Sequence, residues 1–220
     1  SGITICDGMA ADFAECKEHI VPAHPFSDDI ISVSRKLAER FCCDTEHIHQ
    51  VEIAALKLFD ALRKANHLTK KDRLLLQIAA ILHNCGSFLN LNDIGENSYK
   101  IVTSTEIIGL SHQERMIVAY VIRYTTGDFP EYSEIKNEFS REEYIKIAKL
   151  NAILCLADAM DRSHQQKFTN FTVRKRGYDL TITGQTLYDI TLEHGMFIQK
   201  SPFFEEAFGI RPVLRQKKCL

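Results

Sequence analysis

Apolar residues recur three and four positions apart through much of residues 27–165, which is the spacing of one buried face of an α-helix. The clearest stripe contains five apolar residues: Ile48, Val51, Ala55, Leu58 and Leu62. A second segment, from Leu74 to Leu82, is apolar at most of its positions. The pattern predicts an all-helical domain over residues 27–165.

Helix-start signals divide this region into separate helices. In a capping box, a hydroxyl side chain and an acidic side chain three residues later each satisfy a backbone N–H group of the first helical turn. Such boxes begin at Thr69, Ser111 and Ser140, although the first has Asp in place of the preferred Glu. Asp44 or Thr45 can cap the helix with the Ile48 stripe. We predict that the last helix runs from about Arg141 to Arg162.

The pattern changes after Gln165 from a helical period to short runs rich in β-branched and aromatic residues. Phe168–Val173 and Asp179–Thr183, with a turn at Arg176-Gly177, predict a β-hairpin. Three further elements are expected: a strand at Leu187–Leu192, a helix over residues 193–208, and a strand at Ile210–Leu214. The expected fold class is therefore mainly α, a helical bundle followed by a small α+β subdomain over residues 166–220.

The composition is that of a globular protein, with 45% hydrophobic and 25% charged residues. With 27 basic and 29 acidic side chains, the chain is not a strongly basic polymer-binding protein, and we expect no DNA partner. The charge is unevenly spread, however. Residues 162–220 carry 10 basic and 5 acidic side chains, against 17 and 24 in residues 1–161. This positive C-terminal part can attract a polyanion, or it can simply be a solvated face.

The seven cysteines form no C-x-x-C pair, and their number is odd. We therefore expect reduced thiols in a cytoplasmic protein rather than disulfides or a zinc ribbon. No apolar run is long enough to span a bilayer. Phosphate-loop, dinucleotide-binding, nucleophile-elbow and H-E-x-x-H motifs are absent from the sequence. The chain starts Ser1-Gly2-Ile3 without an initiator Met, so we expect it to be a piece of a longer protein.

Potential ligands lie on three of the predicted helices: His47, His83 with Asn84, and Asp158. Each has an ordinary structural explanation. His83 can be a core histidine with satisfied hydrogen bonds, and Asp158 can anchor a helix to a loop. A carboxylate in a run as apolar as Cys155-Leu156-Ala157 must nevertheless be paired, hydrogen-bonded or metal-bound if it is buried.

The combination of these residues resembles the H…HD…D signature of the HD phosphohydrolase superfamily, which binds a divalent metal. Two segments point to one family within this superfamily. Ile78–Gly86 (I-A-A-I-L-H-N-C-G) and Leu156–His164 (L-A-D-A-M-D-R-S-H) are similar to runs in the C-terminal domain of the exopolyphosphatase and guanosine pentaphosphate phosphohydrolase (Ppx/GppA) family. Glu96–Tyr99, Phe203–Gly209 and Ile5–Met9 resemble further parts of that family. The resemblance implies an HD-like domain preceded, over residues 1–26, by a linker from an actin-like N-terminal domain.

Three positions depart from the pattern. Asn84 stands where the superfamily has its defining Asp, Asn97 where the family has His, and Thr125 where it often has His. Neutral oxygens are weaker ligands for a hard divalent cation than carboxylates are. We predict that the metal site is vestigial and that His47, His83, Asn84 and Asp158 bind no metal. The alternative is an active HD-type, metal-dependent phosphohydrolase.

In the family, hydrolysis belongs to the actin-like half, with Mg²⁺ as its cofactor. The resemblance therefore implies no catalytic residue and no cofactor in this piece. It implies that the piece helps to bind polyphosphate or guanosine pentaphosphate and that the whole protein forms a homodimer. The candidate polyanion-binding residues are basic: Lys100, Arg123, Arg162, Arg174, Lys175 and Arg176. Arg174–Arg176 can equally serve to protect an exposed strand edge. The third interpretation of the chain is a purely structural or regulatory interaction domain.

Overall fold

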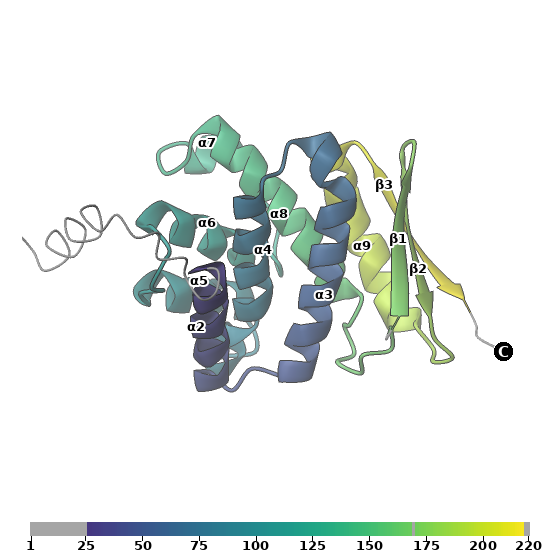
Figure 1. The fold of residues 1–220 in the computed structure, drawn as a ribbon, viewed down its shortest axis with the longest axis horizontal. Helices are drawn as coiled ribbons and strands as arrows, with labels where there is room; N and C mark the ends of the chain where they lie inside the picture. Colours follow the sequence, from purple (N-terminus) through teal and green to yellow (C-terminus); the bar gives the residue numbers. More distant parts are fainter. Residues whose placement is uncertain (1–25, 169, 218–220) are drawn as a thin grey trace, which may run out of the picture.

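The computed structural model describes residues 26–168 and 170–217. The predicted linker over residues 1–26, apart from the backbone of Phe26, lies outside these residues, and so does the Ile5–Met9 segment. The described chain is mainly helical, with a three-stranded sheet near its C-terminus, as the sequence predicts (Figure 1).

The elements follow one another in two groups. The helical group contains α2 (Phe26–Arg40), α3 (Thr45–Leu62), η1 (Arg63–Asn66), α4 (Lys70–Leu82), η2 (Cys85–Phe88), α5 (Ile94–Ser104), α6 (His112–Arg123), α7 (Tyr132–Ile135) and α8 (Arg141–Ala159). The second group contains β1 (Asn170–Arg176), β2 (Asp179–Gln185), α9 (Thr191–Phe208) and β3 (Arg211–Lys217).

Helix α4 lies at the centre of the helical group, where it contacts α2, α3, α6 and α8. Its residues 78–82 are completely buried, which explains why this segment is apolar on every face rather than on one stripe. The three predicted capping boxes are present, since Thr69, Ser111 and Ser140 each accept from the backbone N–H three residues later. Asp44 caps α3 by accepting from the backbone N–H of His47 at 3.2 Å.

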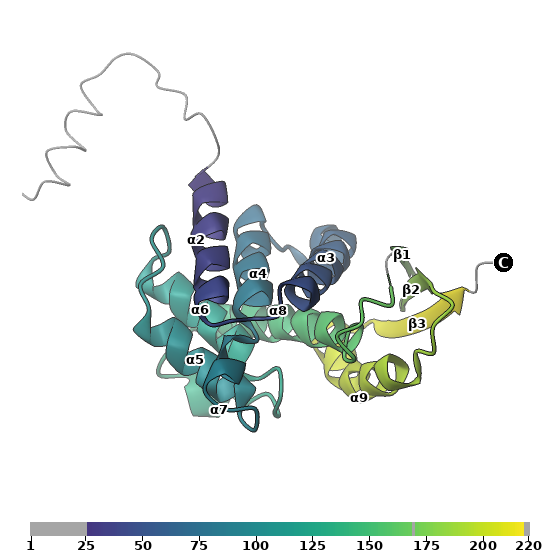
Figure 2. The same cartoon turned by 90° about the horizontal axis from the view of Figure 1, so that it is seen from below.

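The sheet lies at one end of the molecule and α5–α7 at the other, with α8 running between them (Figures 1 and 2). β1 and β2 form the predicted antiparallel hairpin, whose turn contains Gly177 at φ +57°. β3 pairs with β2 in parallel, and α9 provides the crossover between them. One face of the sheet packs on α9 and α3, and the other face is exposed.

The structure corrects the predicted limits of three C-terminal elements. Leu187–Leu192 is not a strand, because side-chain hydrogen bonds form a turn there and Asp189 accepts from the backbone N–H and the hydroxyl of Thr191, the first residue of α9. The last strand is β3, which extends to Lys217 rather than ending at Leu214. Helix α8 ends at Ala159, before the predicted end at Arg162. The residues that follow turn back and bring Asp161 towards α3.

Four cysteines lie in the described part of the chain, and all four are free thiols. Cys43, Cys85 and Cys155 are buried, whereas Cys42 is exposed. The Cys43 thiol donates to the Cys85 sulfur at 3.5 Å. None of the described helices is both long and apolar enough to cross a lipid bilayer.

Candidate functional site

Three of the four residues of the expected vestigial site, His47, His83 and Asp158, meet at one point between α3, α4 and α8. The two Nε2 atoms of His47 and His83 are 3.2 Å apart. The Oδ1 atom of Asp158 lies 3.4 Å from Nε2 of His47 and 3.5 Å from Nε2 of His83. Because the two histidines are almost completely buried and the Asp158 side chain is 19% exposed, the cluster reaches solvent on the Asp158 side.

Local structure places each of these side chains. His47 lies in the first turn of α3, three residues after the Asp44 cap, and His83 ends α4. Asp158 lies in the last turn of α8. The three helices contact one another, so their ends carry the ligand-type groups into the same volume.

The outer nitrogen of each imidazole is held by a hydrogen-bond acceptor. Nδ1 of His83 donates to the backbone oxygen of Ala80 at 2.8 Å, and Nδ1 of His47 donates to Oδ2 of Asp161 at 2.9 Å. These bonds fix both rings with Nε2 directed at Asp158. Metal-binding histidines are typically oriented in this way, through a carbonyl or carboxylate on the other ring nitrogen.

The three donor atoms also have the spacing of metal ligands. Tetrahedral coordination with metal–ligand bonds of about 2.0–2.1 Å separates two ligand atoms by about 3.3–3.4 Å, and the observed separations are 3.2, 3.4 and 3.5 Å. Two imidazoles and one carboxylate suit a transition metal better than Mg²⁺, which prefers an all-oxygen shell. The residues therefore fit a three-ligand ion such as Zn²⁺, which would supply Lewis acidity at the exposed side. The expectation that these positions bind no metal stays a prediction.

The charges of the cluster are strongly coupled. Burial disfavours a charge on His47, but hydrogen bonds and negative charge from Asp158 and Asp161 outweigh it and raise the pKa of His47 to about 9. Burial likewise opposes ionisation of Asp158, yet the two histidines hold the pKa of Asp158 well below its usual range. At neutral pH, His47 is therefore an imidazolium between two carboxylates, and a metal would have to displace its proton.

Two members of the cluster had no role in the sequence interpretation, although both lie in the quoted Leu156–His164 run. Asp161, 1% exposed, also accepts from the backbone N–H of Gln166 at 2.7 Å. The His164 ring stacks on His47, with 3.7 Å between ring centroids and 7° between planes. Nδ1 of His164 also hydrogen-bonds Asp44 at 2.9 Å. The Asp-Arg-Ser-His sequence directly after the helix is the signal from which both residues could have been identified.

The three substituted positions do not complete the ligand set. The Thr125 hydroxyl donates to the backbone oxygen of Ile122 at 2.8 Å, and the Asn97 amide contacts the backbone oxygen of Asn90 at 3.4 Å. Asn84 follows His83 as the half-buried residue before η2. Among the described residues, only His47, His83 and Asp158 form a group with metal-ligand spacing.

The six predicted polyanion-binding residues occupy three separate places. Lys100 and Arg123 both pair with Glu96, at 3.8 and 2.7 Å, and the Arg123 guanidinium lies over the Tyr99 ring. Arg162 lies beside the histidine cluster, 3.9 Å from Asp158. Arg174, Lys175 and Arg176 are exposed on β1, at the opposite end of the molecule from α5 (Figure 1). They do not form one surface.

The sheet gathers a different set of cations, two of them from the predicted set. Alternation places five basic residues on its exposed face: Arg174, Arg176, Arg211, Arg215 and Lys217. Cross-strand pairing confirms this placement, because Thr181, Thr183 and Gln185 of β2 lie opposite Arg174, Arg215 and Lys217. Lys175 is instead paired with buried Leu180, on the other face. Arg215 and Lys217 were missed because the predicted strand stopped at Leu214.

The comparison with protein families gives one clear result. The family model described as Ppx/GppA phosphatase, domain III, matches residues 31–200, which is most of the chain. No curated protein matches the sequence. The chain therefore belongs to the Ppx/GppA phosphatase family, as its C-terminal domain III.

Proposed function

We propose that this domain III holds the phosphate polyanion on which an exopolyphosphatase-type parent protein acts, and that it does so with the exposed face of its sheet. The observation that carries this proposal is the excess of positive charge on that face, where five basic residues of the described chain accompany one carboxylate, Asp179. Many phosphate contacts are needed together because each one is weak in salt.

Strand geometry spaces these cations along a chain of phosphates. Same-face residues on one strand are about 6.6–6.8 Å apart, and neighbouring strands are about 4.8 Å apart. Between the cations of β1 and β3, strand β2 presents the hydroxyl groups of Thr181 and Thr183. Threonine hydroxyls commonly donate to phosphate oxygens. A polyanion crossing the sheet thus meets a cation, a hydroxyl donor and a second cation.

Most of these cations are available to a ligand. Arg211 is bound to Asp179 through its Nε and Nη2 atoms, at 3.0 and 2.9 Å. In the described part of the chain, no carboxylate pairs with Arg174, Arg215 or Lys217. A hollow of about 520 Å³ on the sheet is lined by Arg174 and Lys217, with Asn170, Thr172, Thr183 and Gln185 between them.

The remaining roles rest on the resemblance. We expect the parent protein to release terminal phosphate from polyphosphate or guanosine pentaphosphate in its actin-like half, with Mg²⁺ as cofactor, and to act in the cytoplasm. We also expect this domain to contribute to homodimer contacts. Lys100, Arg123 and Arg162 are less suited to bind a polyanion, because each lies within 4 Å of a carboxylate in the structure.

A titration with long-chain polyphosphate tests the sheet-face proposal. The variant Arg174→Gln/Arg215→Gln/Lys217→Gln should bind at least about tenfold more weakly than the unchanged chain. A control with the same charge change elsewhere is Lys36→Gln/Arg40→Gln/Arg141→Gln, since these three residues are exposed on α2 and α8. Equal losses in the two variants would show that only net charge matters. An unchanged chain that does not bind at low salt would favour a purely structural domain.

A second function, metal-dependent hydrolysis of phosphate esters, is favoured by the convergence of His47, His83 and Asp158. Its test is the metal content of the purified protein together with hydrolysis of p-nitrophenyl phosphate. One equivalent of a transition metal, lost in His83→Ala together with the hydrolysis, would support this function. Protein that contains no metal and does not bind added Zn²⁺ or Mn²⁺ would reject it.

A further inference from the structure

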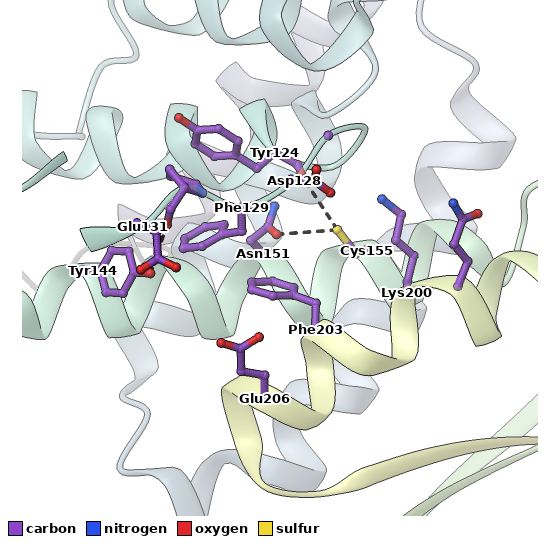
Figure 3. A pocket seen from close by; sticks show the side chains of 13 residues that line it. Tyr124, Asp128, Phe129, Glu131, Tyr144, Asn151, Cys155, Lys200, Phe203 and Glu206 are labelled. Atoms are coloured by element: carbon purple, nitrogen blue, oxygen red, sulfur yellow. Dashed lines mark hydrogen bonds between the residues drawn. The ribbon is translucent and has the colours of Figure 1, made fainter. Parts of the chain in front are cut away.

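A cavity of about 400 Å³ lies between the α6–α7 connection, α8 and α9, apart from the sheet face (Figure 3). Its volume falls within the usual range of small-molecule sites. It is lined by helices α8 and α9 and by residues 124 and 127–131. No part of the function proposed above uses these residues.

One side of the cavity is aromatic. Phe129 is at its centre, with ring centroids 5.5 Å from Tyr124, 5.6 Å from Tyr144 and 5.1 Å from Phe203. All four rings are half-buried and line the cavity. The faces of such rings are electron-rich and attract cations as well as methylene groups.

Three carboxylates line the same cavity: Asp128, Glu131 and Glu206. All are exposed, and none forms an ion pair with a Lys or Arg of the described chain. Glu131 and Glu206 lie towards the Tyr144 end (Figure 3). Burial raises the pKa of Tyr144, and the negative charges of Glu131 and Glu206 raise it further, so this end has a negative potential.

The floor of the cavity, with Cys155 and Asn151, and the end that contains Lys200 offer little to an anion. Burial raises the pKa of the Cys155 thiol to about 12, so it is neutral. The Asn151 amide nitrogen already donates to the backbone oxygen of Val121 at 2.7 Å. Lys200 is the one basic residue among the described residues that line the cavity, and its Nζ donates to the backbone oxygen of Thr125 at 2.8 Å. Three carboxylates outweigh this single positive charge.

We propose that this cavity binds a small aliphatic diamine or polyamine. Aromatic rings can cover the methylene chain while separated carboxylates receive the ammonium groups. An extended cation fits better than a metal ion, because within the described chain these three carboxylates do not form a group with metal-ligand spacing. The inference is independent of polyanion binding by the sheet.

The test uses three linear molecules of similar length and different charge: 1,6-diaminohexane, 1,6-hexanediol and adipate. Calorimetric titration of the 220-residue chain at pH 7 should show binding of the diamine, and little or none of the diol and the dicarboxylate. Tighter or equal binding of the neutral diol would show that charge plays no part, and absence of diamine binding would reject the site.

Matched variants locate the binding. Glu131→Gln/Glu206→Gln should weaken binding of the diamine roughly tenfold, since each exposed charge contributes a few-fold. Glu142→Gln/Glu205→Gln makes the same change in net charge at exposed positions of α8 and α9 outside the lining, and should leave the affinity unchanged. If the two variants lose affinity equally, the diamine binds elsewhere and the proposal fails.

Discussion

Replacing Asp161 by alanine should strongly destabilise the folded domain. The Asp161 side chain is 1% exposed and accepts three hydrogen bonds. They come from Nδ1 of His47 at 2.9 Å and from the backbone N–H and Nε2 of Gln166 at 2.7 and 3.2 Å. Without this carboxylate, a buried imidazolium and the backbone N–H of half-buried Gln166 lose their acceptor.

The size of the effect follows from burial. Removing one partner of a buried ion pair costs about 3–5 kcal/mol, because the other charge is left without compensation. The net stability of a domain is only about 5–15 kcal/mol. For a chain of this length, each kcal/mol lowers the melting temperature by about 2–4 °C, so we expect Asp161→Ala to lower it by about 6–20 °C.

Urea unfolding followed by far-UV circular dichroism at pH 7 measures this loss. Asp161→Asn should have an intermediate effect, since its single amide oxygen can accept from Nδ1 of His47 or from the backbone N–H of Gln166 but not from both. The control is Asp60→Ala, which breaks an exposed ion pair with Arg73 and should cost at most about 1 kcal/mol. If Asp161→Ala lost no more stability than Asp60→Ala, the described role of Asp161 in holding His47 would be wrong.

Three further changes test other parts of the structure. If the sheet face engages four or five phosphates, the logarithm of the polyphosphate binding constant should fall with the logarithm of salt concentration with a slope of about −3, and Arg215→Gln/Lys217→Gln should reduce that slope by about 1.4. Gly86→Ala should cost about 3 kcal/mol in urea unfolding, because its Cβ would lie 2.5 Å from the backbone nitrogen of Ser98. Fully buried Glu193, whose pKa is held below its usual value by Ser163 and Lys167 despite burial, should stabilise the fold above pH 4.5. Glu193→Gln should therefore cost about 1–3 kcal/mol at pH 7, and this difference should shrink as the pH falls below 4.5.

Each of these three predictions has a result that would contradict it. If the double variant had the same salt slope as the unchanged chain, Arg215 and Lys217 would not contact polyphosphate. Gly127→Ala, where a Cβ meets nothing within 4 Å, is the control for Gly86 and should be nearly neutral. A Glu193→Gln deficit that grew on acidification would reverse the sign expected for a depressed carboxyl pKa.

The features that the sequence predicted are those with local signals. A capping box is contained in four residues, so the starts of α4, α6 and α8 could be identified. The β1–β2 hairpin likewise has a turn and two alternating runs within one short segment. His47, His83 and Asp158 could be selected as a set because their order along the chain resembles the H…HD…D signature.

Features that depend on distant pairing were not predicted. The exposed basic face requires β3 to pair with β2, across the whole of α9, in one register. The stacking of His164 on His47 requires a left-handed residue, His164 at φ +54°, after α8. The cavity beside Phe129 joins residues from three elements that share no local pattern.

The order of the strands affects how the domain is completed during synthesis. β3 is the last element described, and the whole of α9 is synthesised between β2 and the strand that pairs with it. Until then, β1 and β2 form a two-stranded hairpin, which is marginally stable by itself. Nascent chains shortened before Arg211 would therefore contain a folded helical group with an incomplete sheet, and would lack three of the five exposed cations.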